Sequence, residues 1–131
     1  MTTATSDALA IGKKLAEYFK QGQFVEAIQE LFSDDAQSIE PENCPDQKNR
    51  IISGKEAMIG KNNWWAENHE IHGMGFKGPF PHDERIAFLL SIDVTAKTGP
   101  MAGQRMEMEE ICIYTIADGK IVKEEFFYGM P

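Results

Sequence analysis

The chain has few cysteines and no segment of membrane length. Of its 131 residues, Cys44 and Cys112 are cysteines, and their spacing matches no zinc or redox motif, so we interpret both as reduced thiols. No apolar run approaches the roughly 20 residues that cross a bilayer, and the N-terminal residues lack the basic and apolar regions of a signal peptide. We therefore expect a cytoplasmic protein without a membrane partner.

Basic residues are also scarce. The chain has 13 Lys and Arg against 21 Asp and Glu, which gives a formal net charge of −8. A surface of this sign repels phosphate backbones, so nucleic acid is not expected as a partner. The remaining composition, 42% apolar and 26% charged without a biased tract, is typical of a globular protein. The length suits one domain over residues 1–131.

Apolar residues at helical spacing predict three helices in the first half of the chain. Their expected ranges are 8–22, 23–36 and 55–70. The second range ends in the acidic pair Asp34 and Asp35, which suits a turn better than a helix C-terminus. Before the third range, Ser53 and Glu56 match a capping box.

The second half of the chain changes to the two-residue period of strands. After a short strand at 36–41, we expect strands over 71–80 and 85–97 and a hairpin around Asp118-Gly119, which is the strongest turn signal in the sequence. Helices followed by a run of antiparallel strands predict an α+β domain. In such a domain the helices cover one face of a curved sheet, and the result is a cone with a hollow inside.

Three segments resemble the SnoaL-like and ketosteroid-isomerase-like branch of the nuclear-transport-factor-2-like superfamily. They are ELFSDDAQSIEP at 30–41, SGKEAM at 53–58 and YTIADGKIVKEEFFYG at 114–129. The resemblance covers nearly the whole chain and implies a cystatin-like cone, with three N-terminal helices packed on a curved antiparallel sheet that encloses an apolar pocket. It implies little about chemistry, because the superfamily includes isomerases, dehydratases, cyclases, hydrolases and binding modules.

The resemblance implies a role for one carboxylate, but a tyrosine that it also implies is missing from this chain. In the isomerase branch a carboxylate just before a proline acts as the proton-shuttling base, and Glu40-Pro41 occupies that place. The same branch has a tyrosine on the first helix as an oxyanion donor, but this chain has Leu15 at about that position, with Tyr18 nearly one turn away. The cyclase branch uses a histidine and a C-terminal aspartate, whereas this chain offers only the glutamates of KEEFF.

Glu110 is a second candidate because of its place in a strand. Strict alternation puts it on one face with Met108, Cys112 and Tyr114, where desolvation would raise its pKa and prepare it for acid–base chemistry. Tyr114 could then donate a hydrogen bond to the same ligand. On the opposite interpretation, Ile111 and its neighbours face the core and Glu110 is a solvated or interface residue. The pattern alone leaves both orientations open.

Further residues are candidates for lining a pocket. The expected ligand-binding residues are Tyr18, Trp64, Trp65, Met108, Cys112 and Phe127, and Tyr128 is another source of a hydroxyl. The two tryptophans are adjacent on a helix, so one of them could instead be a core residue. His69 and His72 do not form a metal-binding spacing, and we expect neither a metal nor a cofactor.

Two functions are open at this point. One is an enzyme that moves a proton or water on a small apolar carbonyl compound, with Glu40, Glu110 and Tyr114 as catalytic residues. The other is a module that binds a small molecule or a protein partner without chemistry. In either case we expect a homodimer, because the second face of the sheet carries Leu89, Ile111 and Ile113 and one layer of helices cannot cover it.

Overall fold

The computed structural model describes residues 4–42, 44 and 46–129. Its elements follow the order helix, helix, strand, strand, helix and four strands, with one short 3₁₀ turn at Gln47–Asn49. The helices are α1 (Ala4–Gln21), α2 (Phe24–Leu31) and α3 (Lys55–Asn68). The strands are β1 (Phe32–Ile39), β2 (Ile51–Ser53), β3 (His69–His82), β4 (Arg85–Ala96), β5 (Arg105–Ala117) and β6 (Lys120–Phe127).

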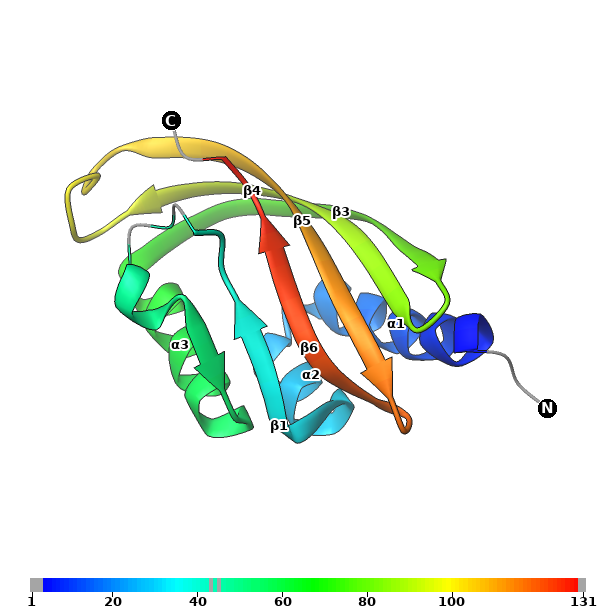
Figure 1. The fold of residues 1–131 in the computed structure, drawn as a ribbon. Helices are drawn as coiled ribbons and strands as arrows, with labels where there is room; N and C mark the ends of the chain where they lie inside the picture. Colours follow the sequence, from blue (N-terminus) through cyan, green and yellow to red (C-terminus); the bar gives the residue numbers. More distant parts are fainter. Residues whose placement is uncertain (1–3, 43, 45, 130–131) are drawn as a thin grey trace.

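The six strands form one curved sheet in the order β2-β1-β6-β5-β4-β3 (Figure 1). Neighbouring strands are antiparallel except β1 and β6, which run parallel, so that the first strand of the chain lies beside the last. The hairpin between β5 and β6 turns at Asp118, whose φ is 50°, and Gly119, whose φ is 75°. Both residues are in the left-handed region that this type of turn requires, as the sequence predicts.

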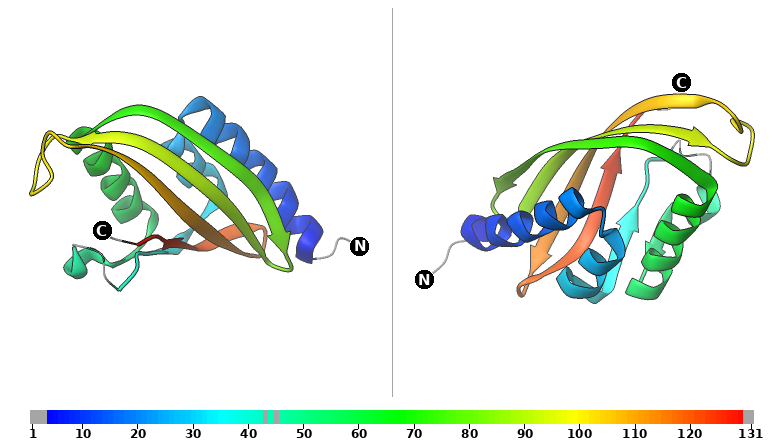
Figure 2. Two further views of the ribbon diagram at one scale, coloured as in Figure 1. Left: turned by 90° about the horizontal axis from the view of Figure 1, so that it is seen from above. Right: turned by 180° about the vertical axis from the view of Figure 1, so that it is seen from behind.

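All three helices lie on the concave face of the sheet (Figure 2). Helix α1 packs on β3 and β4, while α3 packs on β1 and on the start of β3. Gly22, with a φ of 68°, ends α1 and allows the chain to turn directly into α2. The α+β cone predicted from the sequence is therefore confirmed.

The core lies between the helices and the inner face of the central strands. On β4 the predicted apolar stripe is buried: Ile86, Phe88, Leu90, Ile92 and Val94 are between 0% and 8% exposed. Leu15 of α1 and Met58 of α3 close the core from the helical side. Among the described residues, no helix has the length and apolar character to cross a membrane.

Two local predictions from the sequence are wrong. Asp34 and Asp35 do not lie in a turn after α2, because the chain enters β1 already at Phe32, whose side chain is 2% exposed. Burial of Phe32 and Ala36 on the sheet outweighs the turn preference of the two aspartates between them. Ser53 does not cap α3 either, since it ends β2 opposite Gln37 and Gly54 takes the N-cap position without a side-chain bond.

Phe88 gives the first prediction, on stability. Its ring is 1% exposed and lies 5.1 Å from the Phe19 ring and 5.9 Å from the Tyr114 ring, centroid to centroid. Phe88→Ala should lower the free energy of unfolding by about 3–5 kcal/mol in a urea titration, because it leaves a cavity where helix and sheet meet. The control Phe80→Ala, at a ring that is 56% exposed, should cost less than about 1 kcal/mol. Equal losses would contradict this position of the core.

Candidate functional site

Strand β5 presents Glu110 to the inner face of the cone. Its neighbours on the alternation, Cys112 and Tyr114, are 0% and 3% exposed, whereas Ile111 on the opposite face is 47% exposed. Across the sheet Glu110 pairs with Leu90, which belongs to the buried stripe of β4. The orientation that the sequence left open is therefore the inward one.

Strand β6 brings a second carboxyl to this face through a β-bulge. Its pairing with β5 slips by one residue between Ile121 and Lys123, so Val122 has no residue directly opposite. Beyond the bulge, Glu124 pairs with the buried Tyr114. Because a slip of one residue exchanges the two faces of a strand, an unbulged hairpin would turn Lys123 inward and Glu124 outward.

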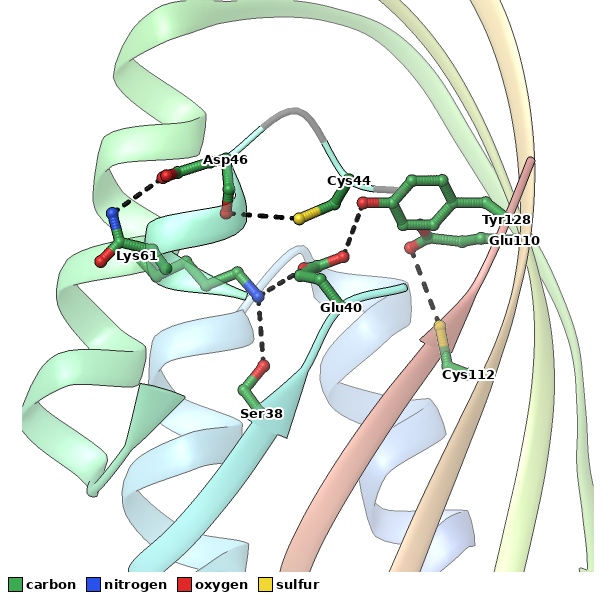
Figure 3. Close-up of polar contacts among 9 residues, drawn as sticks. Ser38, Glu40, Cys44, Asp46, Lys61, Glu110, Cys112 and Tyr128 are labelled. Carbon is green, nitrogen blue, oxygen red and sulfur yellow. Dashed lines mark hydrogen bonds and ion pairs between the residues drawn. The ribbon is translucent and has the colours of Figure 1, made fainter. Parts of the chain in front are cut away.

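A third carboxyl, Glu40, lies just beyond the end of β1 and is held by two donors (Figure 3). The Lys61 ammonium of α3 donates to Glu40 Oε1 at 2.5 Å, and the Tyr128 hydroxyl donates to Glu40 Oε2 at 2.7 Å. Lys61 also donates to Ser38 Oγ at 3.1 Å and lies 5.0 Å from the centre of the Phe126 ring. Donors from α3 and from the segment after β6 thus converge on this carboxylate, and Ser38 of β1 is a second acceptor for Lys61.

Burial changes the acidity of Glu110. Desolvation is the largest cause that raises the pKa of Glu110 to about 7, and the negative charge of Glu40 adds to it. The Cys112 thiol, whose sulfur lies 3.7 Å from Glu110 Oε1, donates a hydrogen bond that acts in the opposite direction, as does the Lys61 charge. Near neutral pH, Glu110 can therefore both give and accept a proton.

Burial also changes the acidity of Glu124. Desolvation raises the pKa of Glu124 to about 7, with further increases from the charges of Glu40 and Glu110. A hydrogen bond from the buried Ser38 hydroxyl and the charge of Lys61 oppose this rise. The charge of Glu110 is thus one of the causes that raise the pKa of Glu124, so the protonation of Glu110 affects that of Glu124.

The hydroxyl and thiol groups around the carboxyls stay protonated. Desolvation raises the pKa of Tyr128 well above its ordinary value, and its hydrogen bond to Glu40 raises it further. Burial also raises the pKa of Tyr114 and of Cys112, where the charge of Glu110 contributes as well. These three groups are therefore neutral hydrogen-bond donors at physiological pH rather than nucleophiles.

A hollow of about 270 Å³ adjoins Glu40 at the ends of β1 and β6. We call it the β1–β6 hollow. It is lined by Ile39, Glu40, Pro41, Arg50, Glu125, Phe126, Phe127 and Tyr128. A second hollow of similar volume lies between α1, α2 and β3 and contacts none of the three inward carboxyls. The β1–β6 hollow is therefore the one that gives a small molecule access to Glu40 and Tyr128.

Comparison with known proteins identifies the family. The SnoaL-like domain matches residues 5–128, almost the whole chain. The chain belongs to the SnoaL-like family. A solved structure of a candidate SnoaL-like polyketide cyclase from Mesorhizobium loti, also described as a carbohydrate phosphatase, is 37% identical, with a TM-score of 0.82 over 91% of this chain and 97% of the other.

More distant structures share the fold of this SnoaL-like domain. A candidate ketosteroid isomerase from Kribbella flavida is 15% identical, with a TM-score of 0.69 over 98% of this chain and 82% of the other. A candidate isomerase from Bacillus subtilis is 16% identical, with a TM-score of 0.70 over 98% of this chain and 90% of the other. A search of curated proteins gave no match. The nuclear-transport-factor-2-like fold expected from the sequence is confirmed.

The candidate residues of the sequence fall into two groups. Cys112 touches Glu110, and Met108 lies on the same inner face of the SnoaL-like domain. Tyr114 is a core residue packed against Phe32, Phe88 and Phe19. Glu40 at the end of β1 and Glu110 and Cys112 of β5 are thus close to one another in the fold, while Tyr114 lies deeper, in the core.

Within the described part of the chain, the other candidates make no hydrogen bond to Glu40, Glu110 or Glu124, although Phe127 lines the same hollow as Glu40. Tyr18 donates from α1 to Glu30 at 2.6 Å, and Trp64 is 58% exposed. Trp65 stacks on His69 with ring centres 4.3 Å apart. Phe127 is turned to the outer face by the bulge in β6, yet it lines the β1–β6 hollow.

Three residues that lie with Glu40 and Glu110 in a polar cluster were not predicted from the sequence as site residues. Glu124 depends on the bulge, while Ser38 and Lys61 come from a strand end and from a helix without a clear apolar stripe. The signal for Ser38 is its position two residues before Glu40, on the same face of β1. Among the residues that the structure describes, no group of three or more His, Cys, Asp or Glu side chains is arranged to hold a metal ion.

The raised pKa of Glu110 gives a prediction on stability and pH. Between pH 4.5 and about 7 the folded protein keeps a proton on Glu110 that the unfolded chain releases, so stability falls as the pH rises through this range. Glu110→Gln removes this loss. We compare the free energy of unfolding of the variant with that of the wild type by urea titration. This difference should be about 1–3 kcal/mol more in favour of the variant at pH 8 than at pH 5.

The matched control is Glu109→Gln on the exposed face of the same strand. It should change stability by the same amount at both pH values. If Glu110→Gln behaves like Glu109→Gln, Glu110 does not titrate near neutral pH.

Proposed function

We propose that this SnoaL-like domain catalyses proton transfer, leading to isomerisation or dehydration, on a small apolar carbonyl compound without a cofactor. One observation carries the proposal: burial raises the pKa of Glu110 and of Glu124 to about 7, beside a third carboxyl that is already paired with Lys61. General acid–base catalysis is most efficient when the pKa of the catalytic group is close to the working pH. The name of the 37% identical protein, a candidate polyketide cyclase, agrees with chemistry at carbonyl groups.

Each carboxyl of the polar cluster has a separate role in the proposed reaction. Glu40 is the base that removes a proton next to the carbonyl, and Lys61 and Tyr128 hold its two oxygens in place. Glu110 does not line the β1–β6 hollow itself; in its protonated form it would be the acid that supplies the returning proton from the inner face, next to Glu40. Glu124 is a second carboxyl that keeps its proton up to about pH 7, and the charge of Glu110 contributes to this.

The surroundings of Glu40 suit an apolar substrate. The β1–β6 hollow offers Ile39, Pro41 and Phe126 as apolar walls, and Glu40 and Tyr128 are its polar groups on the side of the cluster. Its volume of about 270 Å³ lies at the lower end of the range of small-molecule sites. The substrate would therefore be small.

A second candidate function is ligand binding without turnover. The resemblance to the isomerases implies a tyrosine as oxyanion donor at about position 15, and this chain has Leu15 there, 1% exposed in the core. Tyr18 does not replace it, since its hydroxyl donates to Glu30 on α2. Tyr128 is the alternative donor in the first proposal, and without it the site would only bind.

Proton exchange separates the two functions without knowledge of the substrate. Small cyclic ketones such as cyclohexanone and cyclohexenone are incubated with the protein in D₂O, and loss of their α-proton signals is followed by NMR. The wild type should accelerate exchange of at least one ketone. Glu40→Gln should lower that rate by about 10²–10⁴-fold, because it removes a general base.

Glu42→Gln, an exposed position two residues beyond Glu40, is the control and should exchange like the wild type. The acid–base proposal fails if Glu40→Gln and Glu110→Gln exchange the bound ketone as fast as the wild type. Saturable binding without any exchange would favour the second function.

We also propose a homodimer through the outer face of the sheet. Ile111 and Phe127 are 47% and 49% exposed, pair with each other across β5 and β6, and lie on the face that no helix covers. Exposed apolar residues that are adjacent in this way favour association. Sedimentation at micromolar concentration should give a dimer for the wild type and a monomer for Ile111→Glu.

Trp64→Glu, at an exposed apolar residue on α3, is the control and should remain dimeric. A wild type that sediments as a monomer across this concentration range would contradict the proposed homodimer.

A further inference from the structure

Arg50 lies beside the β1–β6 hollow just before β2. Its carbonyl oxygen accepts a hydrogen bond from the Glu40 backbone N–H at 2.8 Å, so the backbone of Arg50 is fixed against the end of β1. Arg50 is partly buried and is one of the residues that line the hollow, together with Glu40 and Tyr128. A cation is thus placed next to the candidate acid–base groups.

The guanidinium of Arg50 has unused hydrogen-bonding capacity. Its Nε is buried and has no hydrogen-bond partner, and none of the ion pairs between described residues includes Arg50. Buried donors are rarely left without an acceptor, because their desolvation is then uncompensated. A bound ligand that brings an acceptor would remove this deficit.

The two acidic residues that line the hollow do not supply the acceptor that Arg50 lacks. Glu40 is bound by Lys61 and Tyr128, and Glu125 lies 3.6 Å from the Lys123 ammonium. Both carboxylates are therefore engaged with other donors. The guanidinium of Arg50, a residue of the hollow, is thus left without a carboxylate partner among the described residues, and the remaining walls of the hollow are largely apolar.

We propose that the β1–β6 hollow binds the carboxylate of a small apolar organic acid, with Arg50 as its counter-ion. The planar fork of a guanidinium matches a carboxylate, which can accept two parallel hydrogen bonds. A single negative charge fits better than a phosphate dianion, because Glu40 and Glu125 line the same hollow and the chain has a net charge of −8. The apolar body of the ligand contacts Ile39, Pro41 and Phe126.

This inference deepens the proposed function and rests on it in one respect, namely that the reacting part of the same molecule reaches Glu40 and Tyr128. The substrate class then becomes a small carbonyl compound that carries a carboxylate. Arg50 is a specificity-determining residue in this scheme, since it selects the charged end and takes no part in the proton transfer.

Benzoate and benzamide are the probes. The two molecules have nearly the same size and shape, but only benzoate is charged, and benzoate has no α-proton that the site could exchange. Binding is followed through the backbone amide signals of residues 125–129 in a ¹⁵N-labelled protein. Benzoate should bind with a dissociation constant in the millimolar range or below, and benzamide should bind more weakly.

The variants test the role of Arg50 directly. Arg50→Met should weaken benzoate binding by about ten- to hundredfold, the usual effect of losing charged hydrogen bonds, and should leave benzamide binding unchanged. Arg50→Lys keeps the charge without the fork, so it should weaken benzoate binding less than Arg50→Met. Arg85→Met, at an exposed arginine that does not line the hollow, should bind benzoate like the wild type.

The inference is overturned if benzoate gives no saturable shift, if benzamide binds equally well, or if Arg50→Met binds benzoate as tightly as the wild type. Because benzoate is not turned over, these outcomes do not depend on catalysis. Loss of ketone exchange alone would remove the proposed function and leave the carboxylate site, and loss of benzoate binding alone would do the reverse.

Discussion

The ion pair between Glu40 and Lys61 is the interaction on which the rest of the site depends. Lys61 is the cation that interacts with all three inward carboxyls, and it is committed to Glu40 at 2.5 Å. An ionised carboxyl inside a protein is stable only when it is paired or well hydrogen-bonded. Glu110 and Glu124 receive only part of this compensation, so each holds its proton up to a pH of about 7.

The fold gathers three carboxyls around the neighbouring ammonium of Lys61. Three strands, β1, β5 and β6, each bring one carboxyl to the same face or to its edge, and α3 brings the ammonium from the helical layer. The hydroxyls of Ser38 and Tyr128 and the thiol of Cys112 donate to the carboxyls without carrying charge. The result is a group of acids and bases that differ in their state of protonation, which is the arrangement that acid–base chemistry requires.

The sequence predicted those features that depend on local periodicity. Alternation in β4 and β5 identified the buried stripe and placed Glu110 beside Cys112, and Asp118-Gly119 identified the last hairpin. Glu124 could not be assigned in this way, because the bulge at Val122 inverts the alternation of β6 beyond it. The same bulge turns Phe127 to the outer face and places Phe126, which the sequence did not single out, opposite Cys112.

Contacts between residues far apart in the chain could not be predicted from the sequence for a different reason. Lys61 lies on a helix whose polar and apolar residues show no clear separation, so nothing in its pattern points toward Glu40, 21 positions earlier in the chain. Strand β2 is only three residues long and exists because it pairs with β1. Burial of Phe32 likewise overrode the turn preference of Asp34 and Asp35.

The measurement that tests this account most directly is a ¹³C NMR titration of the glutamate side-chain carboxyls between pH 3 and pH 9. We expect two carboxyl signals that titrate near pH 7, assigned to Glu110 and Glu124 by substitution, and a lower midpoint for Glu124 when Glu110 is replaced by Gln. If every glutamate titrates close to its ordinary pKa of 4.5, burial on the inner face does not raise the pKa of Glu110 and Glu124, and the proposed chemistry has no basis.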